Sequence, residues 1–142
     1  MEATMNLRHS PPIPESQRSA VAVGLLGIGL IHTLDLPSKW RETPYLGVAY
    51  IVLIAVTLVA ASGLVAGTNR RWGQLAIAAA AAPMIGYVIS RTVGLPAATG
   101  DIGNWLEPLG LASLFVEATV LLLVAQCSLA VKGSESLHSA RT

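Results

Sequence analysis

Five ionisable side chains lie within or at the ends of long apolar stretches of this sequence. A charged group among apolar side chains is unfavourable unless it is paired or reaches water, so such positions are candidates for function. An imidazole can bind a metal or transfer a proton, a carboxyl group can exchange a proton, and a guanidinium can hold an anion or a carbonyl. The five residues are His32, Asp35, Arg91, Glu107 and Glu117.

Glu117 lies near the middle of the last apolar stretch, roughly 15 Å from Glu107 along a helix that rises about 1.5 Å per residue. Helical spacing puts Glu107, Gly110 and Glu117 on one face, which Ser113 borders. One interpretation is a group that exchanges protons or binds a ligand. The other is a protonated glutamic acid that forms a hydrogen bond with another helix.

Arg91 and Glu107 flank the third connecting segment at similar depth. One interpretation is an ion pair that closes a helical hairpin. The other is a pocket in which Arg91 receives an anionic or carbonyl group. Tyr87 precedes Arg91 by four residues and is expected to share its helical face.

His32 and Asp35 are three residues apart, which puts them on nearly the same helical face. A metal or haem site is one interpretation of His32, with Asp35 and Glu107 as the further ligands that a one-histidine site needs. The other histidines, His9 and His138, lie near the chain ends and are not expected to join it. The alternative is a lone histidine in a hydrogen bond, and the pattern indicates no particular cofactor.

The composition restricts the class of protein. Of 142 residues, 53% are apolar and 12% are charged, and the formal net charge is +1. Soluble domains carry about 25% charged residues, and disordered chains combine low hydrophobicity with high charge, so an integral membrane protein remains. The near-neutral charge gives no reason to expect a nucleic-acid partner. The single cysteine, Cys127, excludes an intrachain disulfide, and without a nucleophile–base motif an enzyme is the less expected class.

Four apolar stretches of about 18–27 residues are long enough to cross a bilayer as helices, which takes roughly 20 residues. Helices are favoured because each satisfies its own backbone hydrogen bonds in lipid. The prediction is an all-α domain over 19–131, a four-transmembrane-helix bundle in antiparallel up-down-up-down order. A disordered tail, 1–18, precedes it and a short tail, 132–142, follows. The stretches cover residues 19–36, 44–66, 72–93 and 105–131.

Residues with strong end preferences indicate where the helices begin and end. Thr43 followed by Pro44 is typical of a helix start, and Asn104 with Glu107 three residues later resembles a capping box for the last helix. Pro83 is expected to kink the third helix. Small residues that are expected to end helices or to let them pack closely are Gly24, Gly27, Gly67, Gly94 and the alanines at 78–82.

Lysine and arginine are enriched on the cytoplasmic side of membrane proteins. Six of the nine lie in the tails and the second connecting segment, and three lie in or beside the first and third segments. The prediction is a protein of the cytoplasmic membrane with both termini in the cytoplasm and with segments 37–43 and 94–104 facing outward. The six are Arg8, Arg18, Arg70, Arg71, Lys132 and Arg141, and the three are Lys39, Arg41 and Arg91.

Two segments together resemble a known family. One is Ile31-His32 followed by TPYLGV at 43–48, and the other is SRTVGLP at 90–96 followed by WLEPLG at 105–110. Over residues 28–122 the pattern is similar to a family of small four-helix integral membrane proteins of high-GC Gram-positive bacteria. The resemblance implies the four-helix architecture and no reaction. A more distant similarity is to DoxX-like four-helix proteins, some of which are tied to redox partners.

Three functions fit these features. The first is an accessory or small-molecule-binding protein whose lipid- or quinone-like ligand enters a polar pocket in the outer half of the bilayer. The second is a proton-linked transporter or channel component that acts as an oligomer through Glu117. The third is a structural or assembly subunit of a larger membrane complex. Besides the bilayer, the expected partner is a second copy or a membrane complex. The pocket of the first function would be lined by His32, Tyr87, Arg91, Glu107 and Glu117.

Overall fold

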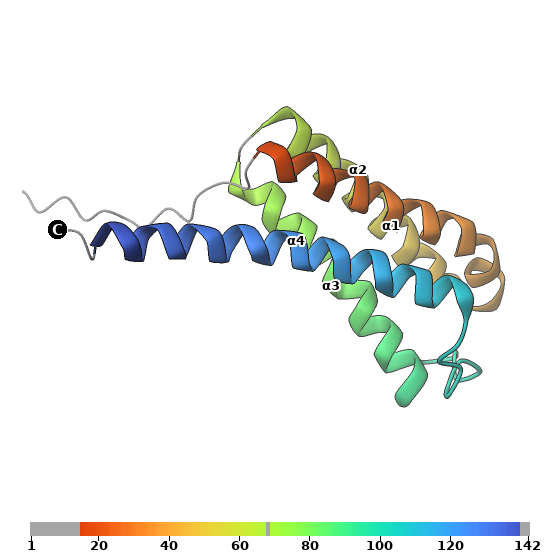
Figure 1. Cartoon of the computed structure of the whole chain (residues 1–142). Coiled ribbons are helices and arrows are strands. Elements are labelled where there is room, and N and C mark those ends of the chain that lie inside the picture. Colours follow the sequence, from red (N-terminus) through yellow and green to blue (C-terminus); the bar gives the residue numbers. More distant parts are fainter. Residues whose placement is uncertain (1–14, 68, 140–142) are drawn as a thin grey trace, which may run out of the picture.

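The computed structural model describes residues 15–67 and 69–139, and this part of the chain forms four consecutive antiparallel helices (Figure 1). All four are long and apolar enough to cross a membrane. The predicted four-transmembrane-helix bundle is confirmed, and the protein is a multi-pass membrane protein. The helices are α1 (Glu15–Glu42), α2 (Pro44–Ala66), α3 (Arg70–Thr92) and α4 (Pro108–Ser139).

α1 begins earlier than the sequence predicts, at Glu15 rather than near Ser19. Its first turn is held to the end of α2, because the Arg18 guanidinium donates a hydrogen bond to the Gly67 carbonyl at 3.1 Å. The last four residues of the predicted tail, 1–18, are therefore helical, and its other residues lie outside the described part of the chain.

α1 also ends later than predicted, because the expected loop at 37–43 is reduced to a break at Thr43. The helix continues through Pro37. One residue is enough to connect the two helices, because the Thr43 N–H donates to the Lys39 carbonyl at 2.9 Å. Pro44 then occupies the first position of α2, where a backbone N–H would have no partner within the helix. Thr43 precedes α2 as predicted, but its side chain makes no capping hydrogen bond.

α4 begins at Pro108, and the residue that caps it is Glu107 rather than Asn104. The Glu107 carboxylate accepts hydrogen bonds from the backbone N–H groups of Leu109 at 3.0 Å and Gly110 at 2.6 Å. The predicted capping box is wrong because proline occupies the first helical position, which makes its neighbour the capping residue.

The C-terminal end of α4 also differs from the prediction. The helix continues past 131 to Ser139, so the expected tail, 132–142, is helical over its first eight residues, and 140–142 lie outside the described residues. Figure 1 shows this part of α4 extending beyond the ends of the other helices.

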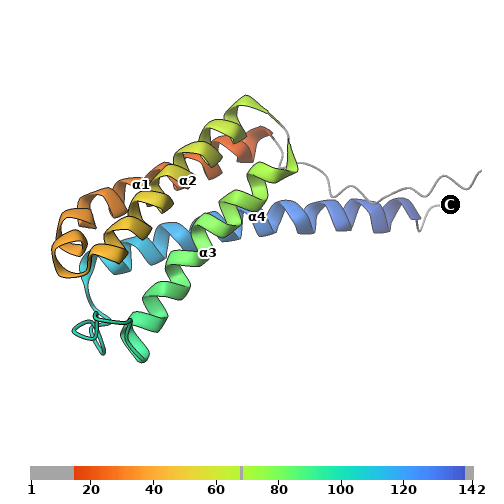
Figure 2. The ribbon, with the colours of Figure 1, turned by 180° about the vertical axis from the view of Figure 1, so that it is seen from behind.

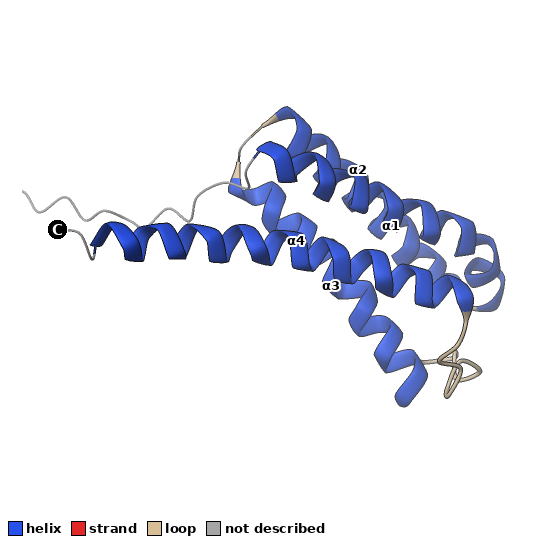
Figure 3. Ribbon diagram, in the orientation of Figure 1, coloured by secondary structure: helices blue, strands red, loops and turns tan. Residues whose placement is uncertain are grey.

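The predicted ends of α2 and α3 are confirmed. Gly67 follows α2. Gly94 follows α3 with a φ of 81°, a left-handed conformation that glycine adopts without strain, and its N–H donates to the Ile89 carbonyl at 2.9 Å. Pro83 lies inside α3. The long connection to α4, residues 93–107, is the tan loop between these helices in Figure 3.

The two ends of the bundle pack differently. We call the half that contains Thr43 and the loop 93–107 the long-loop half, and the half that ends at Gly67 the short-loop half. In the short-loop half a Cβ added to Gly24 would overlap Val120, and one added to Gly63 would overlap the Trp72 ring. These glycines therefore bring the helices into close contact, as predicted for Gly24. The buried apolar residues around them include Val21, Leu25, Ala60, Leu64, Ala76, Ala80 and Val124.

Candidate functional site

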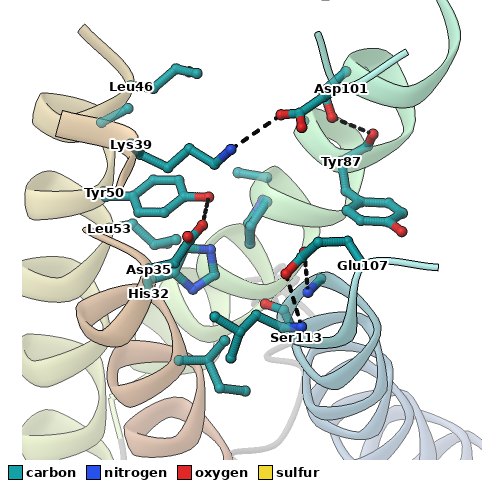
Figure 4. Close-up of a pocket in the computed structure, with 18 of the residues that line it drawn as sticks. His32, Asp35, Lys39, Leu46, Tyr50, Leu53, Tyr87, Asp101, Glu107 and Ser113 are labelled. Atoms are coloured by element: carbon teal, nitrogen blue, oxygen red, sulfur yellow. Dashed lines mark hydrogen bonds and ion pairs between the residues drawn. The ribbon is translucent and has the colours of Figure 1, made fainter. Parts of the chain in front are cut away.

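A cavity of about 260 Å³ lies between the helices in the long-loop half. Figure 4 shows side chains of α1 and α2 on one wall facing those of α3, α4 and the long loop on the other. Among the lining residues, Ala49 of α2 and Ala82 of α3 are themselves exposed. The cavity therefore opens between α2 and α3, which diverge toward this end in Figure 2. In a bilayer this opening faces the lipid tails.

A chain of ion pairs lines the end of the cavity that is next to the long loop. Arg91, only 5% exposed, pairs with Asp101 at 2.9 Å and with Glu107 at 3.6 Å between nitrogen and oxygen atoms. Lys39 of α1 pairs with Asp101 at 3.2 Å and with Glu42 at 3.3 Å. Asp101 thus links α1 to α3 through the long loop. The predicted ion pair of Arg91 and Glu107 is present, but Asp101 is the closer partner.

The electrostatics of Asp101 favour its charged form. Burial raises the pKa of this carboxyl group, but the hydrogen bond from Lys39 and the charges of Lys39 and Arg91 outweigh burial and hold the pKa below its ordinary value. Asp101 and Lys39 were not among the residues that the sequence selected. The available signal was charge balance, because Asp101 is an acidic residue of the loop at the same end of the bundle as the cations Lys39, Arg41 and Arg91.

Tyr87 holds Arg91 and the long loop in place. The guanidinium carbon of Arg91 lies 4.8 Å from the centroid of the Tyr87 ring, a cation–π contact. The Tyr87 hydroxyl donates to the Trp105 carbonyl at 2.8 Å, and the ring packs on Gly110, where a Cβ would overlap it. The prediction that Tyr87 shares a face with Arg91 is confirmed.

Both oxygens of Glu107 are engaged. They accept the two backbone hydrogen bonds at the start of α4, and Oε2 also pairs with Arg91. Glu107 lines the cavity, as predicted, but its carboxylate is committed to positioning α4 and Arg91.

His32 packs against Tyr50 of α2, with ring centroids 4.7 Å apart in an edge-to-face arrangement. Its Nδ1 lies 2.9 Å from the Ile28 carbonyl, and because a carbonyl only accepts, Nδ1 is the donor. In a neutral imidazole Nε2 is then an acceptor. This atom has no partner among the described residues, and the ring lines the cavity.

The carboxylate of Asp35, suggested as a metal ligand beside His32, is engaged in hydrogen bonds with hydroxyl groups. It accepts hydrogen bonds from the Ser38 hydroxyl at 2.6 Å and the Tyr50 hydroxyl at 3.1 Å. In residues 15–67 and 69–139, no group of three His, Cys, Asp or Glu side chains is arranged to hold a metal ion. The suggested set of His32, Asp35 and Glu107 is therefore not formed.

Glu117 lies at the closed end of the cavity and is only 1% exposed. Gly27 of α1 faces Val116 of α4, so Glu117 sits about one and a half helical turns deeper than His32. The Ser113 hydroxyl donates to Oε1, whereas Oε2 is buried without a partner in the described part of the chain. The hydrogen bond of Glu117 is thus within its own helix, and the interhelical bond offered as one interpretation is not among those described.

All five predicted pocket residues line this one cavity, although they come from three helices and a loop. They are His32, Tyr87, Arg91, Glu107 and Glu117. Comparison of the chain with protein-family models, curated proteins and solved structures found no match. The resemblance to four-helix proteins of high-GC Gram-positive bacteria therefore stays a prediction.

Proposed function

We propose that the protein binds a lipid- or quinone-like small molecule within the membrane and acts there as a binding or accessory protein. The observation that carries the proposal is a cavity that is apolar over most of its wall, polar at a few points and open toward lipid between α2 and α3. Apolar pockets with a few converging polar groups are the usual form of small-molecule sites.

The size of the cavity favours one ring or headgroup rather than a whole lipid. A cavity of about 150 Å³ accommodates a benzene molecule, so the cavity of about 260 Å³ has room for a ring with several substituents. An apolar tail on that ring would leave between Ala49 and Ala82 and lie among the lipid chains. A ligand with a small head and a long tail therefore fits best.

Filling the cavity tests this proposal. Gly86 lines it, and a Cβ added there meets no atom within 4 Å, so the side chain of Gly86→Leu would extend into this space. Ala78→Leu is the matched control, because Ala78 is exposed on the same helix and does not line the cavity. Native mass spectrometry of gently extracted protein should show a bound small molecule on wild type and Ala78→Leu but not on Gly86→Leu. Equal occupancy of all three would overturn the proposal.

For the orientation, we infer that the long-loop half faces outward in the cytoplasmic membrane. Support comes from the six-to-three bias of lysine and arginine, and from the pairing of Lys39 and Arg91 with Asp101. In a Cys127→Ser background, Thr99→Cys should react with an impermeant maleimide on intact cells, and Asn69→Cys only after lysis. The reverse pattern would contradict this orientation.

A further inference from the structure

The cations beside the cavity are already paired. Lys39 contacts the carboxylates of Glu42 and Asp101, and Arg91 contacts those of Asp101 and Glu107. An anionic ligand would have to displace one of these carboxylates and leave it near the cavity with a charge that has lost its partner. The ion pairs therefore disfavour a phosphate or carboxylate headgroup.

One polar atom that remains open in the wall, Nε2 of His32, is an acceptor. His32 is 6% exposed, its Nδ1 donates to the Ile28 carbonyl, and its Nε2 is not among the side-chain atoms that are fully buried without a partner. Neighbouring Asp35 also offers only acceptor oxygens, which already receive two hydroxyl hydrogens. A carbonyl or ether oxygen brought to His32 would therefore leave Nε2 without a donor, which is unfavourable in a buried site.

From this arrangement we infer that the ligand is a neutral amphiphile whose ring carries a hydroxyl group, and that this hydroxyl donates to Nε2 of His32. Within the quinone-like class, the reduced quinol form meets this requirement and the quinone form does not. The inference rests on the proposed function and deepens it, because it specifies the chemistry of the headgroup that enters the cavity.

The test compares two probes that have the same ring and tail and differ in their donors, together with one anionic amphiphile. Decylhydroquinone and decylbenzoquinone are titrated anaerobically into the purified full-length protein in one zwitterionic detergent, and dodecyl phosphate represents an anionic headgroup. We expect the hydroquinone to bind about tenfold more tightly than the quinone, the effect of one satisfied buried acceptor. Dodecyl phosphate should bind more weakly than the hydroquinone.

A variant pair assigns the preference to one residue. His32→Phe keeps a ring against Tyr50 but removes the acceptor, and we expect the preference for hydroquinone to fall to about threefold or less. Thr33→Val is the control, because the Thr33 hydroxyl bonds to the Gly29 carbonyl of its own helix and does not line the cavity. This control should keep the full preference.

Each other outcome overturns the inference in a distinct way. Equal affinity for hydroquinone and quinone would overturn the hydroxyl requirement while leaving the binding cavity in place. A preference that survives in His32→Phe would overturn the role of Nε2. Tighter binding of dodecyl phosphate would overturn the argument from the paired cations. If neither ring probe binds, the inference fails, whereas the proposed function fails only if Gly86→Leu and wild type carry the same bound molecules.

Discussion

The long-loop half and the short-loop half are built from the same four helices, yet one surrounds a cavity with charged and polar side chains and the other is packed mainly through apolar residues. In the short-loop half, Gly24 and Gly63 let neighbouring helices approach until side chains meet backbone. In the long-loop half, the helices are joined by polar contacts that centre on Asp101 and Tyr87. Glycine contacts occur in both halves, since Cβ atoms at Gly47 and Gly110 would overlap the rings of Trp40 and Tyr87, but the long-loop half adds contacts made by charged side chains.

This difference shows how a bundle in lipid can hold a cavity open. Between helices in a bilayer there is little hydrophobic driving force, so close packing and hydrogen bonds decide which faces meet. The ion pairs of Asp101 with Lys39 and Arg91 link α1 and α3 through the loop. Because these links set a separation rather than a close contact, we expect the two halves to respond to different substitutions.

The largest expected effect is in the long-loop half. Asp101→Ala would leave Arg91 and Lys39 without their shared partner. We expect the free energy of unfolding to fall by about 3 kcal/mol, which is the lower end of the range for breaking a buried ion pair, because Asp101 is partly exposed. The measurement is unfolding by sodium dodecyl sulfate in mixed micelles. Glu42→Ala is the control, because Glu42 is a largely exposed partner of Lys39 and should lose about 0.5 kcal/mol or less. Equal losses would contradict the central role of Asp101.

The second effect is in the short-loop half. Gly63→Leu would force a side chain into the Trp72 ring, and overpacking of this kind costs about 2 kcal/mol. Gly86→Leu in the long-loop half should change stability by less than about 0.5 kcal/mol, since it enters open space. The same unfolding assay compares the two variants. A larger loss from Gly86→Leu would remove the contrast between a closed half and an open one.

The third effect is a pH dependence confined to the long-loop half. The pKa of Asp101 is lowered in the folded protein, so its contribution to stability is present above the pKa of the unfolded chain and is lost as the pH falls through the lower, folded value. Part of the Asp101→Ala loss should therefore appear in wild type under acid conditions. Asp101→Asn should show a smaller fall in stability over that range, and an identical fall would show that another carboxyl group is responsible.

The smallest effect separates the hydroxyl of Tyr87 from its ring. Tyr87→Phe removes the hydrogen bond to the Trp105 carbonyl and keeps the ring beside Arg91. We expect a loss of about 0.5–1 kcal/mol in the unfolding assay. Tyr87→Leu also removes the cation–π contact and should lose more, and equal losses from the two variants would show that the ring contributes nothing beyond its volume.

The local signals in the sequence predicted most of the fold and only part of the site. Gly67 and Gly94 end their helices as expected. The capping pattern predicts Asn104 as the cap of α4, whereas Glu107 caps it, because the helix begins one residue later at Pro108. The pairing of Arg91 with Glu107 was predicted from their similar depth, but the closer partner, Asp101, depends on how fifteen loop residues fold back.

The sequence by itself determined that this is a four-helix membrane protein and which ionisable residues need an explanation. The reason is that the thickness and apolar character of the bilayer constrain the length and composition of each membrane-spanning segment. Only the tertiary structure decided which of those residues still have an open atom. The carboxylates of Glu107 and Asp35 are taken up by side chains or backbone groups, whereas Nε of Arg91, Nε2 of His32 and Oε2 of Glu117 have no hydrogen-bond partner among the described residues. Hydrogen-bond saturation depends on distances between helices, and the order of residues along one helix does not contain those distances.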